Sequence, residues 1–398
     1  MNKTILHASR AIAYSLIVGL VAATAGAQPS DSQSAAACLT HSPTPNGPQA
    51  SGTSSIAYQE FPASGPLETA WYVTFDHDIG KALFITGAYF MPAPNREFVQ
   101  VLGRAGLSEL FVPYQSGNPR YADLSGFSFD LVEVTARDTG PCGRIVGRDD
   151  KVVREVVDKG PLWKNDDLVV RGQKLLLWGT LDAANYNYII RYEFHDDGTI
   201  KFRIAGTAVN LPGQASEPHT HNALWRIDVN LNGHLGDSVY VLRHVETVGS
   251  PSWQNAVTPF NGGREGPTDF APTEFTQIAV VDSRLINGFG EQTSYELRPL
   301  YRGVVRHAEL YLRNDFWVTV NRPIEQYFPD LLQYVNDEPI QDADVVLWHV
   351  TPMLHLPRSE DGVALGSPYA NGVALAMWAG FDMRPRNLFD RTPFYPSR

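Results

Sequence analysis

Residues 188–204 read YIIRYEFHDDGTIKFRI, and this stretch predicts a β-hairpin. Every second residue from Tyr188 to Phe194 is large and apolar, which is the period of a strand with one buried face. The Asp196-Asp197-Gly198 segment supplies the turn, because Asp and Gly tolerate the backbone angles that tight turns require. Residues 199–204 are then expected to form the second strand.

Short apolar stretches of the same kind recur along the chain, with turn residues between them. They cover residues 71–75, 82–86, 224–230, 238–245, 274–281, 316–320 and 345–350. Two short segments, 107–111 and 329–335, carry helical patterns instead. Many strands with few intervening helices predict an all-β fold, a single large antiparallel β-sandwich domain.

The composition sets limits on the partners of this chain. Its 398 residues are 43% hydrophobic and 11% aromatic, which is enough to build a large core and excludes general disorder. The formal net charge of −11 would repel nucleic acid and an anionic membrane surface. We therefore expect neither nucleic acid nor a membrane among its main partners.

The first residues have the pattern of a targeting segment. Lys3 and Arg10 precede an apolar run over residues 11–23, and Ala25-Gly26-Ala27 resembles a cleavage site. Residues 1–27 are therefore predicted to be a signal peptide, so that the protein is exported to the periplasm or secreted. A membrane anchor is the weaker alternative, because the apolar run is too short to span a bilayer.

The segment that follows, residues 28–66, is rich in Ser, Pro, Ala, Thr and Gly. It predicts a flexible linker, because it has few large apolar side chains to offset the entropy cost of ordering. Residues 67–398 are then the folded domain. Cys38 and Cys142 are the only cysteines, so at most one disulfide can form, and the sequence leaves their pairing open.

Three histidines are candidate metal ligands. His219 and His221 are two positions apart on a predicted strand, so both imidazoles point to the same face. Imidazole suits copper, zinc, iron and nickel. His355 follows another apolar strand and could complete the set. Alternatively, His219 and His221 are polar residues on an exposed strand, and His355 is a hydrogen-bonded loop residue. A metal-dependent enzyme without a quinone, such as a dioxygenase, is a further alternative. Residues 222–228 argue against it, because they contain no Glu that could serve as a ligand after the histidine pair.

Several segments together resemble the copper-containing quinone amine oxidases. Residues 345–361 (VVLWHVTPMLHLPRSED) and 380–390 (GFDMRPRNLFD) are similar to the C-terminal signature of that family. Residues 104–114 (RAGLSELFVPY) and 162–164 (LWK) are similar to two further family segments, in the same order. The resemblance covers the catalytic β-sandwich domain only, and it implies that His219, His221 and His355 bind Cu²⁺.

The resemblance also implies an organic cofactor. Asn185-Tyr186-Asn187-Tyr188 occupies the place of the family's Asn-Tyr-Asp/Glu motif, in which the tyrosine is oxidised to topaquinone beside copper. Tyr186 would be the topaquinone precursor, and Asn185 belongs to the same cofactor motif. The quinone carbonyl would capture a primary amine covalently. The alternative is that Tyr186 is an ordinary strand aromatic.

The resemblance to this family also implies roles for three further catalytic residues. Tyr121-Ala122-Asp123 matches the segment that supplies the family's base, so Asp123 would remove the α-proton of the bound substrate. Tyr121 would be a gate on the substrate route, and Tyr114 would hydrogen-bond a quinone oxygen. The alternative for Asp123 is a loop acid that caps a turn.

A second, structural cation is also implied, and oxygen-only ligation would suit Ca²⁺. Asp228 and Asp344 match family carboxylates, while Val229 and Val345 would offer carbonyl oxygens. Asn230 stands where a second carboxylate is usual, so one lost charge should weaken binding and occupancy stays open.

Some positions depart from the family pattern. Asn187 replaces an acid, and 33 residues separate Tyr186 from His219, a shorter span than usual. Cys142 lies near a family disulfide position, but valines stand where its partner would be. Because the ligands and the key Tyr and Asp are retained, we expect retained chemistry.

These observations predict an exported primary-amine oxidase that converts a primary amine, O₂ and water to aldehyde, ammonia and hydrogen peroxide. The resemblance further implies a homodimer formed through this domain, with a trimmed arm. The alternative is a non-catalytic copper-binding β-sandwich that has lost the quinone chemistry. The sequence does not identify the amine.

Overall fold

A computed structural model of the chain describes most of residues 38–390. The residues it leaves out within that range are 40, 43, 45–47, 49–53, 62–68, 93–96, 167–168, 212, 215, 248, 250–251, 301–307, 324–326, 359–360 and 362–374. Contacts divide the chain into residues 1–37 and 38–398, and the predicted signal peptide lies outside the described residues. No helix in the described part has the length and apolar character needed to cross a membrane.

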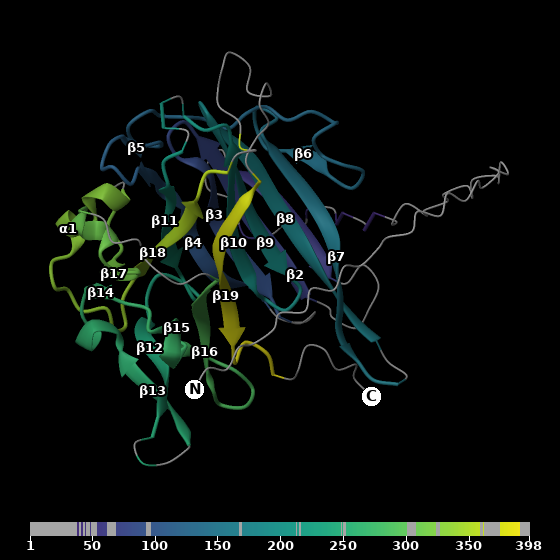
Figure 1. The fold of residues 1–398 in the computed structure, drawn as a ribbon. Coiled ribbons are helices and arrows are strands. Elements are labelled where there is room, and N and C mark those ends of the chain that lie inside the picture. The colour runs from purple at the N-terminus through teal and green to yellow at the C-terminus, as the bar shows by residue number, and fades with distance from the viewer. Residues whose placement is uncertain are drawn as a thin grey trace, which may run out of the picture. The chain divides into compact units, whose positions relative to one another are not determined.

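The first of two antiparallel sheets runs in the order β1-β2-β3-β4-β11-β18-β17-β14, with β5 paired to β4 (Figure 1). Its strands are β1 (Ser55–Phe61), β2 (Thr69–Asp78), β3 (Ala82–Met91), β4 (Val99–Pro113), β5 (Arg120–Ala122), β11 (His219–Val229), β14 (Gly266–Thr268), β17 (Phe316–Val320) and β18 (Val345–His355).

The second sheet runs in the order β13-β12-β15-β16-β19-β10-β9-β8-β7-β6. Its strands are β6 (Arg144–Val146), β7 (Val152–Lys164), β8 (Val169–Ala183), β9 (Tyr186–His195), β10 (Ile200–Ala208), β12 (Asp237–Glu246), β13 (Trp253–Pro259), β15 (Gln277–Ile286), β16 (Gln292–Pro299) and β19 (Met377–Arg386).

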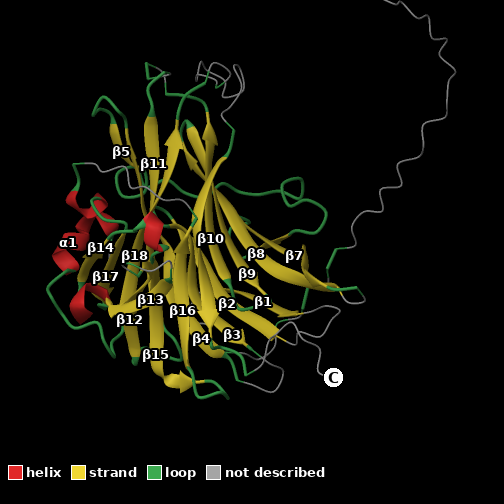
Figure 2. Cartoon of the chain, turned by 60° about the horizontal axis from the view of Figure 1, so that its bottom comes forward, coloured by secondary structure: helices red, strands yellow, loops and turns green. Residues whose placement is uncertain are grey.

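Helices are short and lie mainly beside β14 and β17 (Figure 2). Those in the described residues are the 3₁₀ helices η1 (Phe260–Gly263), η2 (Pro272–Glu274), η3 (Leu310–Leu312) and η4 (Phe328–Asp330), and the α-helix α1 (Leu331–Tyr334). The predicted helical segment 329–335 therefore coincides with η4 and α1.

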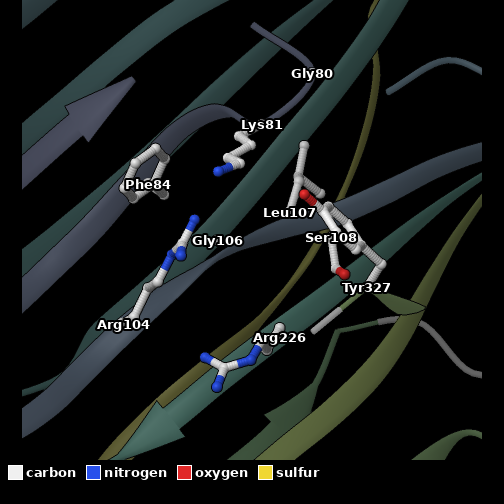
Figure 3. A pocket seen from close by; sticks show the side chains of 9 residues that line it. All are labelled: Gly80, Lys81, Phe84, Arg104, Gly106, Leu107, Ser108, Arg226 and Tyr327. Atoms are coloured by element: carbon white, nitrogen blue, oxygen red, sulfur yellow. The ribbon is translucent and has the colours of Figure 1, made fainter. Parts of the chain in front are cut away.

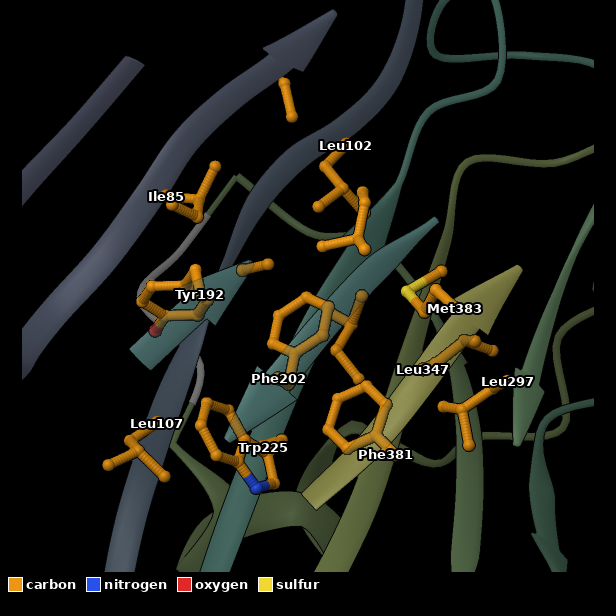
Figure 4. Close-up of a cluster of buried hydrophobic side chains, with 14 of the residues drawn as sticks. Ile85, Leu102, Leu107, Tyr192, Phe202, Trp225, Leu297, Leu347, Phe381 and Met383 are labelled. Atoms are coloured by element: carbon orange, nitrogen blue, oxygen red, sulfur yellow. The ribbon is translucent and has the colours of Figure 1, made fainter. Parts of the chain in front are cut away.

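The main core lies between the two sheets. Trp225 of β11 packs edge-on against Phe202 of β10 and Phe381 of β19, each with ring centroids 5.7 Å apart (Figure 4). All three side chains are completely buried. Because full burial of a side chain such as Phe contributes about 1.5–3 kcal/mol, this aromatic contact is a substantial link between the sheets. The predicted all-β antiparallel sandwich is confirmed.

The hairpin predicted at residues 188–204 is formed by β9 and β10. Tyr188, Ile190, Tyr192 and Phe194 are fully buried on the inner face of β9, as their alternation predicts. Gly198 in the turn has φ +81°, and a Cβ there would meet Pro385 at 3.1 Å. Glycine is therefore required at this position both by the backbone angle and by the space available.

The predicted helical pattern at residues 107–111 is wrong, because these residues lie in β4. Leu107, Leu110 and Phe111 have the i, i+3, i+4 spacing of a helix face. However, β4 lies between β3 and β11 and is buried on both faces over this stretch, so apolar residues occur without alternation. Periodicity alone does not separate such a strand from a helix.

The predicted flexible linker, residues 28–66, is also wrong in its last part. Ser55–Phe61 forms the edge strand β1, which pairs with β2 along its whole length. Ala57, Tyr58 and Phe61 are buried, so this segment offsets its ordering cost by packing on the sheet. Residues 28–37, most of 40–53 and residues 62–66 of this segment lie outside the described residues.

The two cysteines, whose pairing the sequence left open, form a disulfide. It joins Cys38 to Cys142 across 104 positions of the chain. His41 lies beside the bridge, with Nε2 3.2 Å from the carbonyl oxygen of Cys142. The bridge therefore ties the start of the described residues to the loop between β5 and β6.

Candidate active site

The three predicted histidine ligands come together between neighbouring strands. In the pairing of β11 with β18, His219 lies directly opposite His355, and His221 lies on the same face two residues further along. One ring nitrogen from each of the three lies within 4.8 Å of the others, and all three side chains are buried. Residues 136 positions apart in the chain are thus adjacent through strand register.

Two of the imidazoles are oriented by oxygen acceptors behind them. His219 Nδ1 donates to the carbonyl oxygen of Glu217 at 2.9 Å, and His355 Nε2 donates to Asp361 Oδ2 at 3.0 Å. Each ring then presents a nitrogen lone pair to the centre, Nε2 for His219 and Nδ1 for His355. Such acceptors behind a ring hold the tautomer and orientation of metal-ligating histidines in general.

The third imidazole is oriented by a hydrogen-bonded chain. Tyr188 Oη donates to Asp123 Oδ2 at 3.3 Å, and it lies 2.7 Å from His221 Nδ1. Because the tyrosine hydrogen is used on the carboxylate, His221 Nδ1 carries the proton and donates to Tyr188. His221 Nε2 is then an acceptor, and it is buried without a hydrogen-bond partner among the described residues.

Burial keeps the rings of His219 and His221 neutral. Burial lowers the pKa of His219 to about 4 and lowers that of His221 well below its usual value. Burial opposes ionisation of Asp361, but hydrogen bonds from Arg358 and His355 outweigh it and set its pKa at about 2. Neutral imidazoles are the form that binds metal, and the buried Nε2 of His221 would gain the partner it lacks. The three residues therefore fit a copper ion.

Tyr186, the first residue of β9, lies at the centre of the histidine cluster. Its Oη is 2.8 Å from His219 Nε2 and 2.7 Å from His355 Nδ1, and its ring centroid is 4.3 Å from that of His221. Burial raises the pKa of Tyr186, so the phenol keeps its proton and can donate to one of the two nitrogens at a time. The structure thus places the predicted cofactor precursor against all three rings.

Tyr188 and Glu109 are two site residues that sequence reasoning missed as functional groups. Tyr188 links Asp123 to His221, and the signal for it was present, since alternation puts Tyr186 and Tyr188 on the same strand face. Glu109 of β4 is fully buried, and its carboxylate accepts hydrogen bonds from the backbone amides of Leu124 and Ser125. Only the tertiary structure brings Glu109 behind the turn that carries Asp123.

Asp123, the predicted base, lies just after β5 and is buried. Burial raises its pKa to about 7, the charge of Glu109 adds to this, and the hydrogen bond from Tyr188 acts in the opposite direction. A carboxyl group that titrates near neutral pH is suited to accept and release a proton under physiological conditions.

Tyr114 and Tyr121 flank the same cluster. The Tyr114 ring stacks on His219, with centroids 4.3 Å apart, and its backbone bridges that of His219. Tyr121 meets Tyr114 edge-on with centroids 6.3 Å apart and lies on the outer side of it, where it is half-buried. Tyr114 therefore contacts a predicted metal ligand directly and Tyr121 contacts Tyr114, while the roles implied for both stay predictions.

The cofactor motif residues on either side of Tyr186 point elsewhere. Asn185 Nδ2 donates to the carbonyl oxygen of Val209 at 3.0 Å, which anchors the chain before β9. Asn187 alternates to the other strand face and donates to Asp182 Oδ1 at 3.3 Å. The departure from the family pattern at Asn187 therefore does not reach the histidines.

The residues predicted to bind a second cation lie close together, but side-chain amides of Asn321 and Asn230 lie among their carboxylates. Asn321 Nδ2 lies 3.2 Å from Asp228 Oδ2 and 3.3 Å from Asp344 Oδ2, and Val229 pairs with Val345. In its favoured orientation the Asn230 amide donates to Asp228 Oδ1 at 3.1 Å and to the carbonyl oxygen of Val229 at 3.0 Å. Within the described residues, the histidine cluster is the only group of three metal-ligating side chains so close together.

A pocket over β3, β4 and β11 lies apart from these residues (Figure 3). Lys81, Arg104 and Arg226 contribute its charged groups, and none of the predicted site residues lines it. Three cations would repel a protonated amine, so this pocket is not suited to the amine substrate that the resemblance implies.

The fold and the three converging imidazoles define a β-sandwich protein with a candidate metal centre. Residues 157–398 match the family profile for copper amine oxidase, enzyme domain. The chain therefore belongs to the copper amine oxidase family.

Curated relatives agree with this assignment. A peroxisomal copper-containing diamine oxidase of Nicotiana tabacum is 25% identical over 291 residues, which cover 59% of this chain and 36% of the relative. Histamine oxidase of Arthrobacter globiformis is 23% identical over 368 residues, covering 74% of this chain and 51% of the relative. The chain thus matches about a third to a half of the length of these relatives.

Solved structures share the fold. A copper-containing benzylamine oxidase from Hansenula polymorpha superimposes with a TM-score of 0.65 at 18% identity, covering 81% of this chain and 59% of the other. An Aspergillus nidulans amine oxidase gives a TM-score of 0.62 at 16% identity, covering 82% and 52% of the two chains.

Proposed function

We propose that this chain is a copper- and topaquinone-dependent primary-amine oxidase. It would convert a primary amine, O₂ and water into an aldehyde, ammonia and hydrogen peroxide. The observation that carries the proposal is the phenol oxygen of Tyr186, 2.8 and 2.7 Å from the inward nitrogens of His219 and His355. Bound copper and the quinone made from this tyrosine would supply the oxygen chemistry and the carbonyl group that captures the amine.

The side chains of the protein have separate tasks in this proposal. His219, His221 and His355 would each hold the metal through one ring nitrogen, and the other nitrogen of each ring is already hydrogen-bonded. Asp123 accepts the α-proton of the substrate, because its raised pKa gives it a useful fraction of both protonation states near pH 7. Tyr114 would fix a quinone oxygen by hydrogen bonding, and Tyr121, outside it, would gate access.

The decisive experiment is chemical conversion of Tyr186. Metal-free protein is incubated in air with Cu²⁺ or with Zn²⁺, and the peptide that contains Tyr186 is analysed by mass spectrometry. We expect two oxygen atoms to be gained and two hydrogens lost with copper only, because zinc has no redox chemistry. Phenylhydrazine should then label the same peptide, and a Tyr186→Phe variant should show neither change.

An unmodified Tyr186 in a sample shown to hold one copper per chain would refute the oxidase. The remaining reading would be the non-catalytic copper-binding sandwich, which binds metal and releases no hydrogen peroxide with any amine. If conversion occurs, a peroxide-coupled screen of aliphatic, aromatic and polyamine substrates identifies the substrate class.

Export and dimerisation are further parts of the proposal. Residues 1–27 have the pattern of a signal peptide, and fractionation with N-terminal sequencing should find a mature chain that begins at Gln28. The hairpin of β12 and β13 carries exposed Trp253 and Val257, which supports a homodimer with this hairpin in the interface. Sedimentation at several concentrations, with a Trp253→Ser variant beside the wild type, tests the dimer.

Ca²⁺ at the Asp228 and Asp344 set is likewise proposed. Asp344 Oδ1 is buried without a hydrogen-bond partner among the described residues, which supports a cation there. Metal analysis after dialysis against Ca²⁺, with Asp344→Asn as comparison, should find one ion that the variant loses.

A further inference from the structure

A hollow of about 650 Å³ lies on the second sheet, over the neighbouring strands β7, β8, β9, β10 and β19. Figure 1 shows these strands side by side. His195 lines the hollow at the end of β9, and Tyr186 is the first residue of the same strand. Nine residue steps separate them, or about 30 Å, so the hollow is remote from the histidine cluster.

Cations predominate in the lining of this hollow. Lys159, Lys174, Lys201 and Arg384 contribute to it, against one carboxylate, Asp197. The chain as a whole has a net charge of −11, so this concentration of positive charge is local and contrary to the general balance. A protonated amine would be repelled here.

The acids beside the hollow are already paired, and the strand register shows how. Lys201 of β10 lies opposite Glu193 on β9. Glu193 is held by Lys174 at 2.8 Å and by Arg191 at 2.9 Å, and it also lies 3.2 Å from His195. The Glu193 carboxylate is therefore already paired with two other cations, Lys174 and Arg191.

The arrangement on the other side of Lys201 is similar. Asp382 on β19 lies opposite Lys201 and is bound by Arg203 at 2.5 Å and by Arg384 at 3.0 Å. At the far edge, Lys159 is compensated by Asp196 at 2.7 Å and Asp197 at 3.2 Å. Around the centre of the hollow, cations thus outnumber the carboxylates available to them.

Lys201 carries the unbalanced charge. No hydrogen bond or ion pair joins its side-chain ammonium group to another residue that the structure describes. Burial lowers its pKa, and the nearby charges of Arg203 and Lys174 add to this, while Asp382 and Glu193 oppose it. An anion in the hollow would stabilise the charged form of Lys201 and complete the charge balance.

We propose that this hollow binds a phosphate group, free or carried on a small molecule, between Lys174, Lys201 and Arg384. A phosphate monoester carries about −1.5 to −2 charge at neutral pH and offers three strong acceptor oxygens. Cationic side chains from β8, β10 and β19 line the hollow together, and the several oxygens of a phosphate group could accept hydrogen bonds from more than one of them. The site goes beyond the proposed oxidase activity and does not depend on it.

The test is calorimetric titration of the full chain with inorganic phosphate at constant ionic strength, against a chloride blank. We expect saturable binding, at least tenfold weaker in Lys201→Met and in Arg384→Gln. Lys164→Met is the matched control, because it removes one lysine charge at the exposed end of β7, outside the hollow, and should bind as the wild type does. Using the Tyr186→Phe chain without metal keeps the result independent of the oxidase proposal.

Parallel titrations distinguish the sources of the phosphate group. Glycerol 3-phosphate represents a small metabolite, and sedimentation with phosphatidylcholine vesicles that contain phosphatidic acid represents a lipid headgroup. Thermal melts establish whether each variant is folded. If Lys201→Met does not fold, Arg384→Gln is the deciding variant, because the Arg384 side chain is half exposed and its replacement should not disturb the fold. Binding no stronger than the chloride blank, or equal in wild type and folded variants, would overturn the proposal.

Discussion

Burial raises the pKa of Asp123, and the charge of a second buried carboxylate, Glu109, adds to this. Because the base must be ionised to accept a proton, we expect kcat/KM to fall as the pH drops below about 7. Glu109→Gln removes the neighbouring charge, so the acid limb of the pH profile should move to lower pH by about one unit. Glu246→Gln, which neutralises an exposed acid at the end of β12, is the control.

The same substitution should also cost stability. Glu109 accepts hydrogen bonds from the Leu124 and Ser125 amides, and the glutamine amide cannot replace both acceptor oxygens. A loss of about 1–3 kcal/mol is expected, and it is measured separately by thermal melting. An acid limb that stays in place in folded Glu109→Gln would show that Glu109 only supports the turn.

Tyr188 gives a second test at the scale of single residues. Tyr188→Phe removes the acceptor of His221 Nδ1, so the ring loses the bond that holds its orientation. Copper affinity should fall about 10- to 100-fold, as measured by competition with a chelator. Tyr192→Phe is the matched control, because that buried hydroxyl on the same strand face bonds to the Leu83 carbonyl instead. Equal copper affinity in the two variants would contradict this role.

Among the elements, the junction of β14, β17 and α1 depends on one buried carboxylate. Glu265 is fully buried and accepts hydrogen bonds from the backbone amides of Val320 at 2.8 Å and Asn336 at 2.7 Å, with Arg322 3.3 Å away. Arg322 keeps Glu338 at 2.9 Å in Glu265→Gln, but the glutamine amide cannot accept at both of its positions, so the fold should lose about 1–3 kcal/mol.

Urea denaturation measures this loss. Asp337→Asn is a suitable comparison, because it removes an exposed carboxylate from a surface pair with Arg264 and should change the free energy of unfolding by less than about 1 kcal/mol. Similar stabilities for the two variants would show that the junction is held by apolar packing.

The elements also show where local pattern was sufficient. β9 and β10 could be predicted because each has one buried face and a turn of suitable residues between them. The segment at residues 107–111 could not, since β4 is covered on both sides and its apolar residues lose their alternation. β1 was missed because Ser55–Phe61 follows a long polar segment and has a partner only once β2 is formed.

For the molecule as a whole, the disulfide constrains the unfolded chain. Cys38 and Cys142 close a loop across 104 positions, and such a crosslink stabilises mainly by removing conformations from the unfolded state. Cys38→Ser should lower the free energy of unfolding by about 2–4 kcal/mol, measured with urea. Reductant should destabilise the wild type equally and leave the variant unchanged, whereas a wild type that is insensitive to reductant would contradict the prediction.

Both sheets contribute to the candidate site, which is why it needs the complete sandwich. The histidines come from β11 and β18 in one sheet, while Tyr186 and Tyr188 come from β9 in the other. Asp123 is added by the turn after β5. The packing between the sheets therefore holds the phenol against the imidazoles.

Local patterns in the sequence determined the alternation of β9 and β10 and the shared face of His219 and His221, because side-chain direction in a strand repeats every two residues. The likeness to known amine oxidases supplied the remaining roles. Only the tertiary structure decided that His355 lies opposite His219, that Tyr188 joins Asp123 to His221, and that a cationic hollow forms across five strands. These arrangements depend on strand register and sheet packing between distant segments, which no local pattern encodes.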